Sequence, residues 1–539
     1  MRGSLLDIMK RWRARMAFPS ACFSRYKDPM HAVFRFDANR QIGLGHMFRC
    51  NVLASKLIDK GARVTFAVSS GSVYPSEQSG RLYKTAILEK SPLSFGEANA
   101  VSSNVAAIDE QEADAAALID AVGEPDLVVV DHYRLDYHWE ACWPKSKVLV
   151  IDDLADRRHH CFALLNQNIG AERAMYNQLV GNDCLFLLGP MFALLRSEFA
   201  ERRKEALFSR ARLKSAGRVF VNFGGTDASN LTLETMIKLS AINRIKRIDV
   251  AIGSLACDLP EIRAFAATKS TIRLHIDALN MAELMADADL AIGAGGSTSW
   301  ERCVLGLPSI VFQVAPNQAA LSSQLCDAGA AISISDMGRL PQVVENTLAN
   351  SAALATMSAV AASICDGRGA VRLADHLWQD RNETLNIRPA DAGDVLDLWT
   401  WRNDLDARRM AFQTMPLPLA SHMHWFEDTK RSAHVKIYIG EQGDEKIGMV
   451  RFDVSDASAL VSVNISPAWR NRGIARQLLR KTIQHFERYH SSIALRAQIR
   501  SENRASQKVF AALGFVLENE TDGVQEYWLK ERANRSIVA

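Results

Sequence analysis

The sequence has few of the features that mark metal-binding, secreted or membrane-spanning proteins. Its nine cysteines, spread over 539 residues, form no Cys-x-x-Cys pair and no Cys/His spacing typical of zinc sites. We therefore predict reduced thiols, a cytoplasmic location and no bound metal. The sequence contains no run of about 18 uncharged apolar residues, which excludes a transmembrane helix of ordinary length. Pro (15) and Gly (30) are too scarce for a disordered or collagen-like chain.

The chain also lacks a large excess of charge of one sign. The net charge is +3, and residues 1–30 alone carry seven Lys or Arg against two Asp, so the remaining chain has a net charge of −2. A protein that binds nucleic acid or a membrane surface needs a dense basic patch on its folded body, so neither class is predicted. Residues 1–30 lack the apolar core of a signal peptide and are predicted to be a disordered basic leader.

Strands and helices alternate along the first 380 residues. At roughly 150 residues per domain, the length suggests about three or four domains. The apolar run Ala32–Phe36 leads through a glycine turn to a predicted helix, and Leu127–Val130 is a short continuous apolar strand. This pattern is typical of a parallel sheet with covering helices. Residues 31–205 are therefore predicted to form a Rossmann-like lobe.

A second alternating unit begins near Arg218. The strands Val219–Phe223 and Leu290–Ile292 each lead into a glycine-rich turn, and a helix over Ser299–Leu305 stops at Gly306. Residues 206–380 are predicted to form a second Rossmann-like lobe, with a ligand in the cleft between the two lobes. The pattern then changes, and residues 385–535 are predicted to form a separate α+β domain.

The turn Gly43-Leu44-Gly45-His46 places a histidine at the start of a predicted helix. This turn follows a strand, and ligands bind at that edge of an open α/β sheet. An imidazole there suits proton transfer, although a capping or core role is commoner for a histidine taken alone. A dinucleotide-binding turn is disfavoured because Phe48 stands where its third glycine would lie.

Two further glycine-rich turns occur in the second unit. Each would present backbone N–H groups and a positive helix end, which can hold a diphosphate without lysines. The residues concerned are Gly224, Gly225, Asp227, Gly295, Gly296, Ser297 and Thr298. Glu301, one helical turn later, could accept hydrogen bonds from a ribose diol; the alternative is an exposed helix glutamate.

Six blocks of the first 380 residues occur in the order found in a known family. They are residues 35–50, 131–135, 151–155, 188–196, 224–227 and 293–303. These blocks resemble the UDP-sugar hydrolases of pseudaminic acid biosynthesis, which have the two-lobed GT-B architecture of MurG-type glycosyltransferases. The resemblance implies hydrolysis of UDP-2,4-diacetamido-2,4,6-trideoxy-β-L-altropyranose to UDP and the free sugar.

The same resemblance implies roles for individual residues. His46 matches the family's general base, and Asn317 matches a polar catalytic position near the sugar, while Glu301 and the glycine turns match the UDP-binding side. The other implied substrate-binding residues are Asp37, Gly43, Gly45, Asp131 and Gln318. The same fold could instead transfer the sugar to an acceptor, and the sequence distinguishes the two reactions poorly.

A different motif, Arg470-x-x-Gly473-x-Ala475, precedes a predicted helix over residues 476–489. A short loop that opens onto a helix N-terminus can hold a pyrophosphate. Ten Lys or Arg against two acidic residues between positions 470 and 508 favour a polyanionic ligand, although each charge taken singly also fits a solvated helix face.

This motif and the segments 503–506 and 510–515 resemble the GNAT-type N-acetyltransferases. Residues 401–404 and 424–426 are similar to the subgroup that acetylates the 4-amino group of UDP-amino-sugars. The resemblance implies acetyl-CoA as co-substrate, with the strand 461–465 pairing with its pantetheine arm. The implied cofactor-binding residues are Val463, Ile465, Arg470, Arg472, Gly473, Ile474, Ala475, Asn503 and Ser506. Phe510 stands where many GNAT enzymes have a Tyr acid, so Tyr527 or water is expected to protonate the leaving thiolate.

The two resemblances together predict a bifunctional enzyme for two consecutive steps. The C-terminal domain would acetylate N4 of a UDP-4-amino-sugar, and the two lobes would hydrolyse the product. The alternative is a glycosyltransferase or sugar-binding protein that carries a non-catalytic GNAT fold. The expected partners are therefore a UDP-amino-sugar and acetyl-CoA, and no oligomeric state is predicted.

Overall fold

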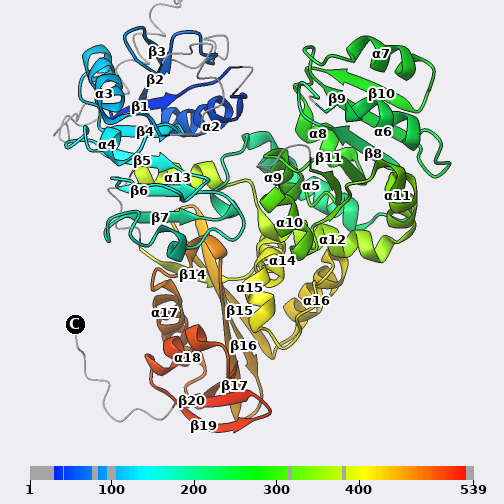
Figure 1. The fold of residues 1–539 in the computed structure, drawn as a ribbon. Helices are drawn as coiled ribbons and strands as arrows, with labels where there is room; N and C mark the ends of the chain where they lie inside the picture. The colour runs from blue at the N-terminus through cyan, green and yellow to red at the C-terminus, as the bar shows by residue number, and fades with distance from the viewer. Residues whose placement is uncertain are drawn as a thin grey trace, which may run out of the picture.

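The computed structural model describes residues 29–39, 42–75, 83–93, 105–227, 229–313, 319–378 and 384–529. Two of the predicted site residues, Asn317 and Gln318, lie outside these described residues, as does the predicted leader up to residue 28. The described chain forms three sheet-based units, coloured blue to cyan, green, and yellow to red in Figure 1.

The first unit is a parallel seven-stranded sheet in the order β3-β2-β1-β4-β5-β6-β7. Its strands are β1 (His31–Phe36), β2 (Arg63–Ser69), β3 (Tyr83–Leu88), β4 (Leu127–Asp131), β5 (Lys147–Ile151), β6 (Ala163–Asn166) and β7 (Leu185–Leu188). Its helices are α2 (Gly45–Asp59), α3 (Ile108–Val122) and α4 (Tyr137–Glu140), with the short 3-10 helices η2 (Arg173–Tyr176) and η3 (Pro190–Phe192). The central strands are buried on both faces, as their continuous apolar runs predict.

The second unit is a parallel six-stranded sheet in the order β10-β9-β8-β11-β12-β13. Its strands are β8 (Arg218–Asn222), β9 (Arg247–Ile252), β10 (Ile272–Ile276), β11 (Leu290–Ala294), β12 (Ser309–Phe312) and β13 (Ala331–Ser333). Its helices are α5 (Ser197–Ala211), α6 (Leu231–Leu239), α7 (Leu259–Ala267), α8 (Met281–Asp287), α9 (Thr298–Val304), α10 (Ala319–Ala328), η5 (Met337–Arg339), α11 (Leu340–Ala349) and α12 (Ser351–Ile364). The prediction of two Rossmann-like lobes is confirmed.

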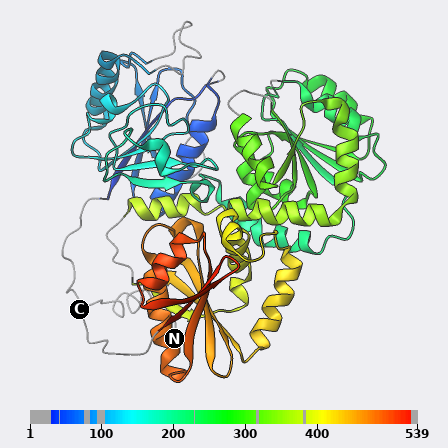
Figure 2. The same cartoon turned by 60° about the horizontal axis from the view of Figure 1, so that its bottom comes forward.

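The last helix of this segment, α13 (Gly369–Leu377), returns to the first lobe. Its apolar side chains Ala370, Leu373, Ala374 and Leu377 belong to the same buried cluster as the core face of α2. The two lobes are therefore joined twice, once through α5 and once through the segment that leads into α13 (Figure 2).

The third unit is a mixed seven-stranded sheet in the order β14-β15-β16-β17-β18-β20-β19, which confirms the predicted α+β class. Its strands are β14 (Asn386–Pro389), β15 (Val435–Gln442), β16 (Glu445–Val454), β17 (Ser458–Ile465), β18 (Ala494–Arg500), β19 (Phe515–Thr521) and β20 (Val524–Leu529). Its helices are η6 (Ala392–Asp394), α14 (Val395–Asn403), α15 (Leu405–Met410), α16 (Leu419–Arg431), η7 (Pro467–Trp469), α17 (Ile474–Tyr489) and α18 (Arg504–Ala511).

Within the described ranges, no single helix is long and apolar enough to cross a membrane. One bent pair, Met337–Ala349 with Ser351–Leu377, passes on length and composition alone.

Buried polar contacts fasten the third unit to both lobes. Arg203 of α5 donates to the carbonyl oxygens of Val304 and Ala362 at 2.6 and 2.8 Å, and to Oγ1 of Thr400 on α14 at 3.0 Å. Trp399, 1% exposed, packs with residues of α5 and α12. The third unit is thus a docked domain rather than a tethered one.

Arg372 of α13 connects the first lobe to the third unit. Its guanidinium binds Asp366, the carbonyl oxygen of Met191 at 3.0 Å and Oε2 of Glu445 at 3.3 Å, while Arg368 lies 2.6 Å from Oε1 of Glu445. Burial opposes the charge on Asp366, but Arg372 outweighs it and lowers the pKa of Asp366 to about 2. The guanidinium of Arg372 thus pairs with Asp366 and shares the buried Glu445 with Arg368.

Replacing Arg372→Met is expected to lower the free energy of unfolding by about 3–5 kcal/mol, because it leaves buried carboxylates without their main partner. Urea denaturation followed by tryptophan fluorescence measures the change. Lys145→Ala is the matched control, since its ion pair with Glu124 is exposed (73% and 59%) and should contribute less than about 1 kcal/mol. Equal effects of the two substitutions would contradict this role of Arg372.

Candidate active sites

The first candidate site lies at the carboxyl edge of the first sheet, where α2 begins. Gly43 has a φ of 91°, a conformation that favours glycine, and its turn brings Gly45 to the start of the helix. His46 follows on the first helical turn and is 8% exposed. Its Nδ1 lies 2.6 Å from Oδ1 of Asp131, the last residue of β4. The structure thus brings together two predicted site residues that are 85 positions apart in the sequence.

The short His46–Asp131 contact outweighs the longer approach of Arg49 to the same nitrogen, at 3.3 Å, and favours one tautomer of the ring. An ionised carboxylate only accepts hydrogen bonds, so we assign the ring proton to Nδ1, which donates to Asp131, and the lone pair to Nε2. Asp131 also holds the ring in one orientation and stabilises the imidazolium that forms when Nε2 takes up a proton. The pair can therefore act as a general base.

Arg49 lies one helical turn beyond His46 and binds two carboxylates. Its Nε and one terminal nitrogen each lie 2.5 Å from an oxygen of Asp131, and the other terminal nitrogen lies 2.6 Å from Oδ2 of Asp153. Burial opposes the charge on Asp131, but Arg49 and His46 outweigh it and hold the pKa of Asp131 well below its usual range. Asp131 is therefore ionised at neutral pH.

Tyr133 closes one side of this site. Its hydroxyl donates to Oδ2 of Asp153 at 3.4 Å, and its ring meets that of His46 edge to face with 5.0 Å between centroids. Burial raises the pKa of Tyr133 well above its usual range, so the hydroxyl keeps its proton.

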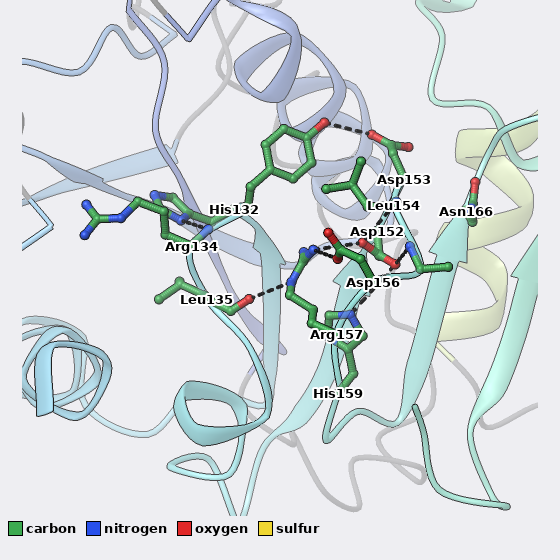
Figure 3. A network of polar contacts seen from close by, with 12 residues as sticks. His132, Arg134, Leu135, Asp152, Asp153, Leu154, Asp156, Arg157, His159 and Asn166 are labelled. Atoms are coloured by element: carbon green, nitrogen blue, oxygen red, sulfur yellow. Dashed lines mark hydrogen bonds and ion pairs between the residues drawn. The ribbon is translucent and has the colours of Figure 1, made fainter. Parts of the chain in front are cut away.

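Arg157 links the loops that follow β4 and β5 (Figure 3). Its Nε donates to the carbonyl oxygen of Leu135 at 3.1 Å, and a terminal nitrogen lies 3.3 Å from Oδ1 of Asp152. Burial opposes the charge on Asp152, but His159 and Arg157 outweigh it and lower the pKa of Asp152 to about 2. The loop that carries Asp153 is therefore fixed by buried ion pairs.

Asp37, a predicted substrate-binding residue, is 1% exposed and faces protein groups. It accepts hydrogen bonds from the backbone N–H of Ser69 at 2.7 Å and from the hydroxyls of Ser69 and Ser72 at 2.8 Å. Arg35 and His132 each lie 3.1 Å from its carboxylate. These contacts use most of its acceptor capacity, so the structure gives Asp37 a role in fixing the end of β1 beside the site.

In the second lobe, the predicted turn after β8 packs against the turn after β9. The N–H of Gly253 donates to the carbonyl oxygen of Gly225 at 2.9 Å, and a Cβ at Gly253 would lie 2.3 Å from that oxygen. Gly224 has a φ of 101°. Asp227 is 3% exposed, and its carboxylate accepts from the N–H groups of Leu231 and Thr232 at 3.2 and 2.9 Å. Asp227 therefore caps α6, whereas Gly224 and Gly225 leave room for a ligand beside the backbone.

The second predicted turn, Gly295 to Ser297, leads into α9 at Thr298. Arg302 fixes it by donating to the carbonyl oxygen of Ala294 and to Oγ of Ser299, both at 2.7 Å. Glu301 lies on the same short helix, its side chain 14% exposed and 3.3 Å from Arg196. Burial raises the pKa of Glu301 to about 7, in spite of that positive charge. Glu301 is thus a largely buried acid rather than an ordinary surface glutamate.

The third domain contains an opening in its sheet. The parallel strands β17 and β18 pair only from Ser458 to Leu460, whereas β17 remains paired with β16 as far as Ile465. The edge of Val461–Ile465 that faces β18 is therefore not used by that strand, and it includes the predicted residues Val463 and Ile465. This edge leads to Gly473, which has a φ of 73° and caps the 16-residue helix α17.

The two arginines of the loop are bound by protein groups. Arg470 donates to the carbonyl oxygen of Ile465 at 3.2 Å and lies 2.6 Å from Oδ2 of Asp404. Arg472 contacts Nε2 of His376 on α13, and its guanidinium lies 5.3 Å from the centroid of the Trp469 ring. The arginines therefore shape the loop, and the groups that it leaves available to a phosphate are the backbone N–H groups at the start of α17, including those of Ile474 and Ala475.

The remaining predicted cofactor residues lie at the start of α18. Asn503 accepts from the N–H of Ser506 at 3.0 Å, so their pairing caps this helix. Phe510 is 3% exposed and packs edge to face on Phe515, which accounts for an apolar residue at this position. The hydroxyl of Tyr527 donates to Gln525 at 2.9 Å.

Sequence analysis did not assign roles to Arg49, Tyr133 or Asp153. A pattern was present for two of them: Arg49 follows His46 by three positions on a helix, and Asp153 follows β5 at the sheet edge where β4 ends in Asp131. That Arg49 and Asp153 contact each other beside His46 depends on the order of the strands, which the sequence does not show. Among the described residues, no group of three or more His, Cys, Asp or Glu could hold a metal ion.

Comparisons with known proteins show which families the parts of the chain resemble. The family model described as "Acetyltransferase (GNAT) domain" matches residues 384–516, and the one described as "Glycosyltransferase family 28 C-terminal domain" matches residues 261–371. The chain is 30% identical over 305 residues to the UDP-2,4-diacetamido-2,4,6-trideoxy-beta-L-altropyranose hydrolase of Campylobacter jejuni, which covers 56% of this chain and 97% of that protein.

Solved structures similar to parts of the chain include two of interest here. MurG of Acinetobacter baumannii covers 65% of this chain and 99% of its own, with a TM-score of 0.48 and 14% identity. The Campylobacter jejuni N-acetyltransferase PseH in complex with acetyl coenzyme A covers 28% of this chain and 100% of its own, with a TM-score of 0.23 and 14% identity.

The likeness to both families that the sequence predicted is confirmed, and the match of the GNAT family model to residues 384–516 supports acetyl-CoA as the expected co-substrate of the third domain. The first two lobes match almost the full length of the Campylobacter hydrolase. The chain therefore belongs to the UDP-2,4-diacetamido-2,4,6-trideoxy-β-L-altropyranose hydrolase family and carries a fused GNAT acetyltransferase domain.

Proposed function

We propose that the two lobes hydrolyse UDP-2,4-diacetamido-2,4,6-trideoxy-β-L-altropyranose to UDP and the free sugar. The observation that carries this proposal is the His46–Asp131 pair, which leaves Nε2 as a base at the sheet edge where ligands bind. In the proposed step, the oxygen of a water molecule attacks C1 of the sugar while Nε2 takes its proton. The bond between C1 and the phosphate oxygen breaks, and UDP leaves with the electron pair.

In this proposal, separate protein groups bind the UDP and the sugar of the substrate. Around UDP, the turns at Gly224–Gly225 and Gly295–Thr298 supply backbone N–H groups that stabilise the charge developing on the leaving phosphate. Glu301 accepts hydrogen bonds from the ribose. At the sugar, Gly43 and Gly45 allow close approach of the α2 turn. The roles that the resemblance implies for Asn317 and Gln318 near the sugar stay predictions, because both lie outside the described residues.

His46→Ala is expected to lower kcat for UDP release by about 100- to 10,000-fold, because it removes the general base. The affinity for UDP should stay nearly unchanged. Asp131→Asn, which keeps the volume but cannot stabilise an imidazolium, is expected to lower kcat by at least about tenfold. Coupled detection of UDP measures the rates, and calorimetry measures the affinity.

The matched control is His138→Ala, because His138 forms a similar pair with Asp136 at 3.1 Å, but with a side chain that is 44% exposed and remote from the α2 turn. Its turnover should equal that of the unmodified protein. Strong residual turnover in His46→Ala would refute the assignment of the base.

The raised pKa of Glu301 predicts how UDP binding depends on pH. Above about 7 the carboxylate is ionised and accepts two hydrogen bonds; below it, protonation removes one acceptor, so UDP should bind progressively more weakly as the pH falls from 8 to 6. Calorimetric titration of UDP at each pH tests this expectation. Glu301→Gln corrects for titration of UDP itself, and identical pH profiles of the two proteins would contradict the ribose assignment.

We further propose that the third domain transfers an acetyl group from acetyl-CoA to N4 of a UDP-4-amino-4,6-dideoxy sugar. The free edge of Val461–Ile465 would pair with the pantetheine arm, and the α17 loop would hold the pyrophosphate. The amine nitrogen attacks the thioester carbonyl, the C–S bond breaks, the nitrogen gives up a proton to solvent as the amide forms, and the CoA thiolate takes up a proton. Because Phe510 cannot supply that proton, Tyr527 or water supplies it.

The product of the third domain would then be the substrate of the two lobes, and fusion raises its local concentration. Incubating the protein with acetyl-CoA and the UDP-4-amino-sugar should give, by mass spectrometry, the N4-acetylated nucleotide sugar, then UDP and the free diacetamido sugar. Formation of a glycoside on an added acceptor would favour a glycosyltransferase instead. Absence of free CoA would indicate a non-catalytic GNAT fold.

A further inference from the structure

The cofactor loop of the acetyltransferase domain is attached to the hydrolase part of the chain. Arg472, within the Arg470–Ala475 motif, donates to Nε2 of His376 on α13. The two residues are 96 positions apart and belong to different domains. The short helix η7 precedes this loop, and its Ala468 lies in the same buried cluster as Leu373 and Leu377 of α13.

His376 is built to accept this hydrogen bond. It is 8% exposed and lies among aromatic rings, with the Phe192 and Trp469 centroids at 6.1 and 6.2 Å. Burial and the nearby positive charge of Arg472 lower the pKa of His376 to about 4, so the ring is neutral at physiological pH. A neutral imidazole presents one lone pair, and here the Arg472 guanidinium faces it.

The loop needs such a constraint because of its backbone. Asn471 and Gly473, on either side of Arg472, have φ values of 61° and 73°. A left-handed conformation is uncommon at residues other than glycine, and asparagine is among those that adopt it most readily, so these two φ values set the direction in which Arg472 leaves the loop. Arg470 is held on one side by Asp404 of the third domain. On the other side, Arg472 is held by the Trp469 ring of the third domain and by His376 of the hydrolase part.

We propose that His376 is a positioning residue of the acetyl-CoA site, so that the hydrolase part completes the cofactor site of the acetyltransferase. This inference rests on the proposed role of the α17 loop as the pyrophosphate site. By holding Arg472, His376 keeps the N–H groups at the start of α17 oriented for the phosphates before acetyl-CoA binds. Preorganisation of this kind lowers the ordering cost of binding.

The test uses the full chain and four variants. His376→Ala removes the acceptor, and His376→Phe removes it while filling the space. Both are expected to weaken acetyl-CoA binding by about tenfold in calorimetry and to raise the KM for acetyl-CoA with little change in kcat. In His376→Gln, the amide oxygen can accept from Arg472, so affinity should return to within about threefold of the original.

Asp375→Ala is the matched control on the same helix, because Asp375 pairs with Lys60 of the first lobe and its side chain is 41% exposed. Its affinity for acetyl-CoA should be unchanged. Thermal midpoints of all variants report on folding, and His376→Phe keeps the test valid if the alanine variant is unstable.

Three outcomes would overturn the proposal. Unchanged affinity in both His376→Ala and His376→Phe would mean that the residue only fills space. Tighter binding would mean that His376 holds Arg472 away from the cofactor. Absence of acetyl-CoA binding by the unmodified protein would instead refute the cofactor site itself, which distinguishes failure of that assignment from failure of the positioning role.

Discussion

The buried guanidinium of Arg372 is the contact on which the arrangement of the three units depends. It binds the carbonyl oxygen of Met191 in the first lobe, Asp366 in the segment that returns from the second, and Glu445 in the third domain. A buried charge that loses a partner is costly in free energy. Separating any one of these segments from Arg372 therefore destabilises its contacts with the others. Helix α13, which carries Arg372, is consequently fixed between α2 and the acetyltransferase domain.

The two candidate sites share a way of using charged side chains. At His46, Arg49 binds the carboxylates of Asp131 and Asp153, and Asp131 orients the imidazole. In the third domain, Arg470 and Arg472 are likewise occupied by protein groups, and backbone N–H groups are left for phosphates. In both places, charged side chains pair with other protein groups, which leaves a neutral or backbone group available to a ligand.

Much of the fold could be predicted from the sequence because short sequence patterns indicate its strands, turns and helices. Continuous apolar strands and glycine turns indicate two parallel sheets, and the end of the strand–helix alternation near residue 385 indicates a separate α+β domain. The turn at His46 lies, as predicted, at the carboxyl edge of the first sheet. What local patterns do not contain is strand order and domain contacts. The partners of Asp37, Asp227 and Arg472 therefore could not be predicted: Asp37 and Asp227 prove to be bound by neighbouring backbone and side chains, and Arg472 by a histidine of another domain.

The chain passes between the two lobes twice, and these two passages are where a rotation of one lobe against the other would be centred. Two-lobed enzymes commonly close around a ligand by a hinge rotation, and the hinge lies where the chain passes between the moving bodies. Here those passages are the segments of α5 and α13, and the acetyltransferase domain contacts both, through Thr400 on Arg203 and Glu445 on Arg372. In a rotation of that kind displacements are smallest near the hinge, so the contacts of the third domain lie where closure of the lobes would strain them least.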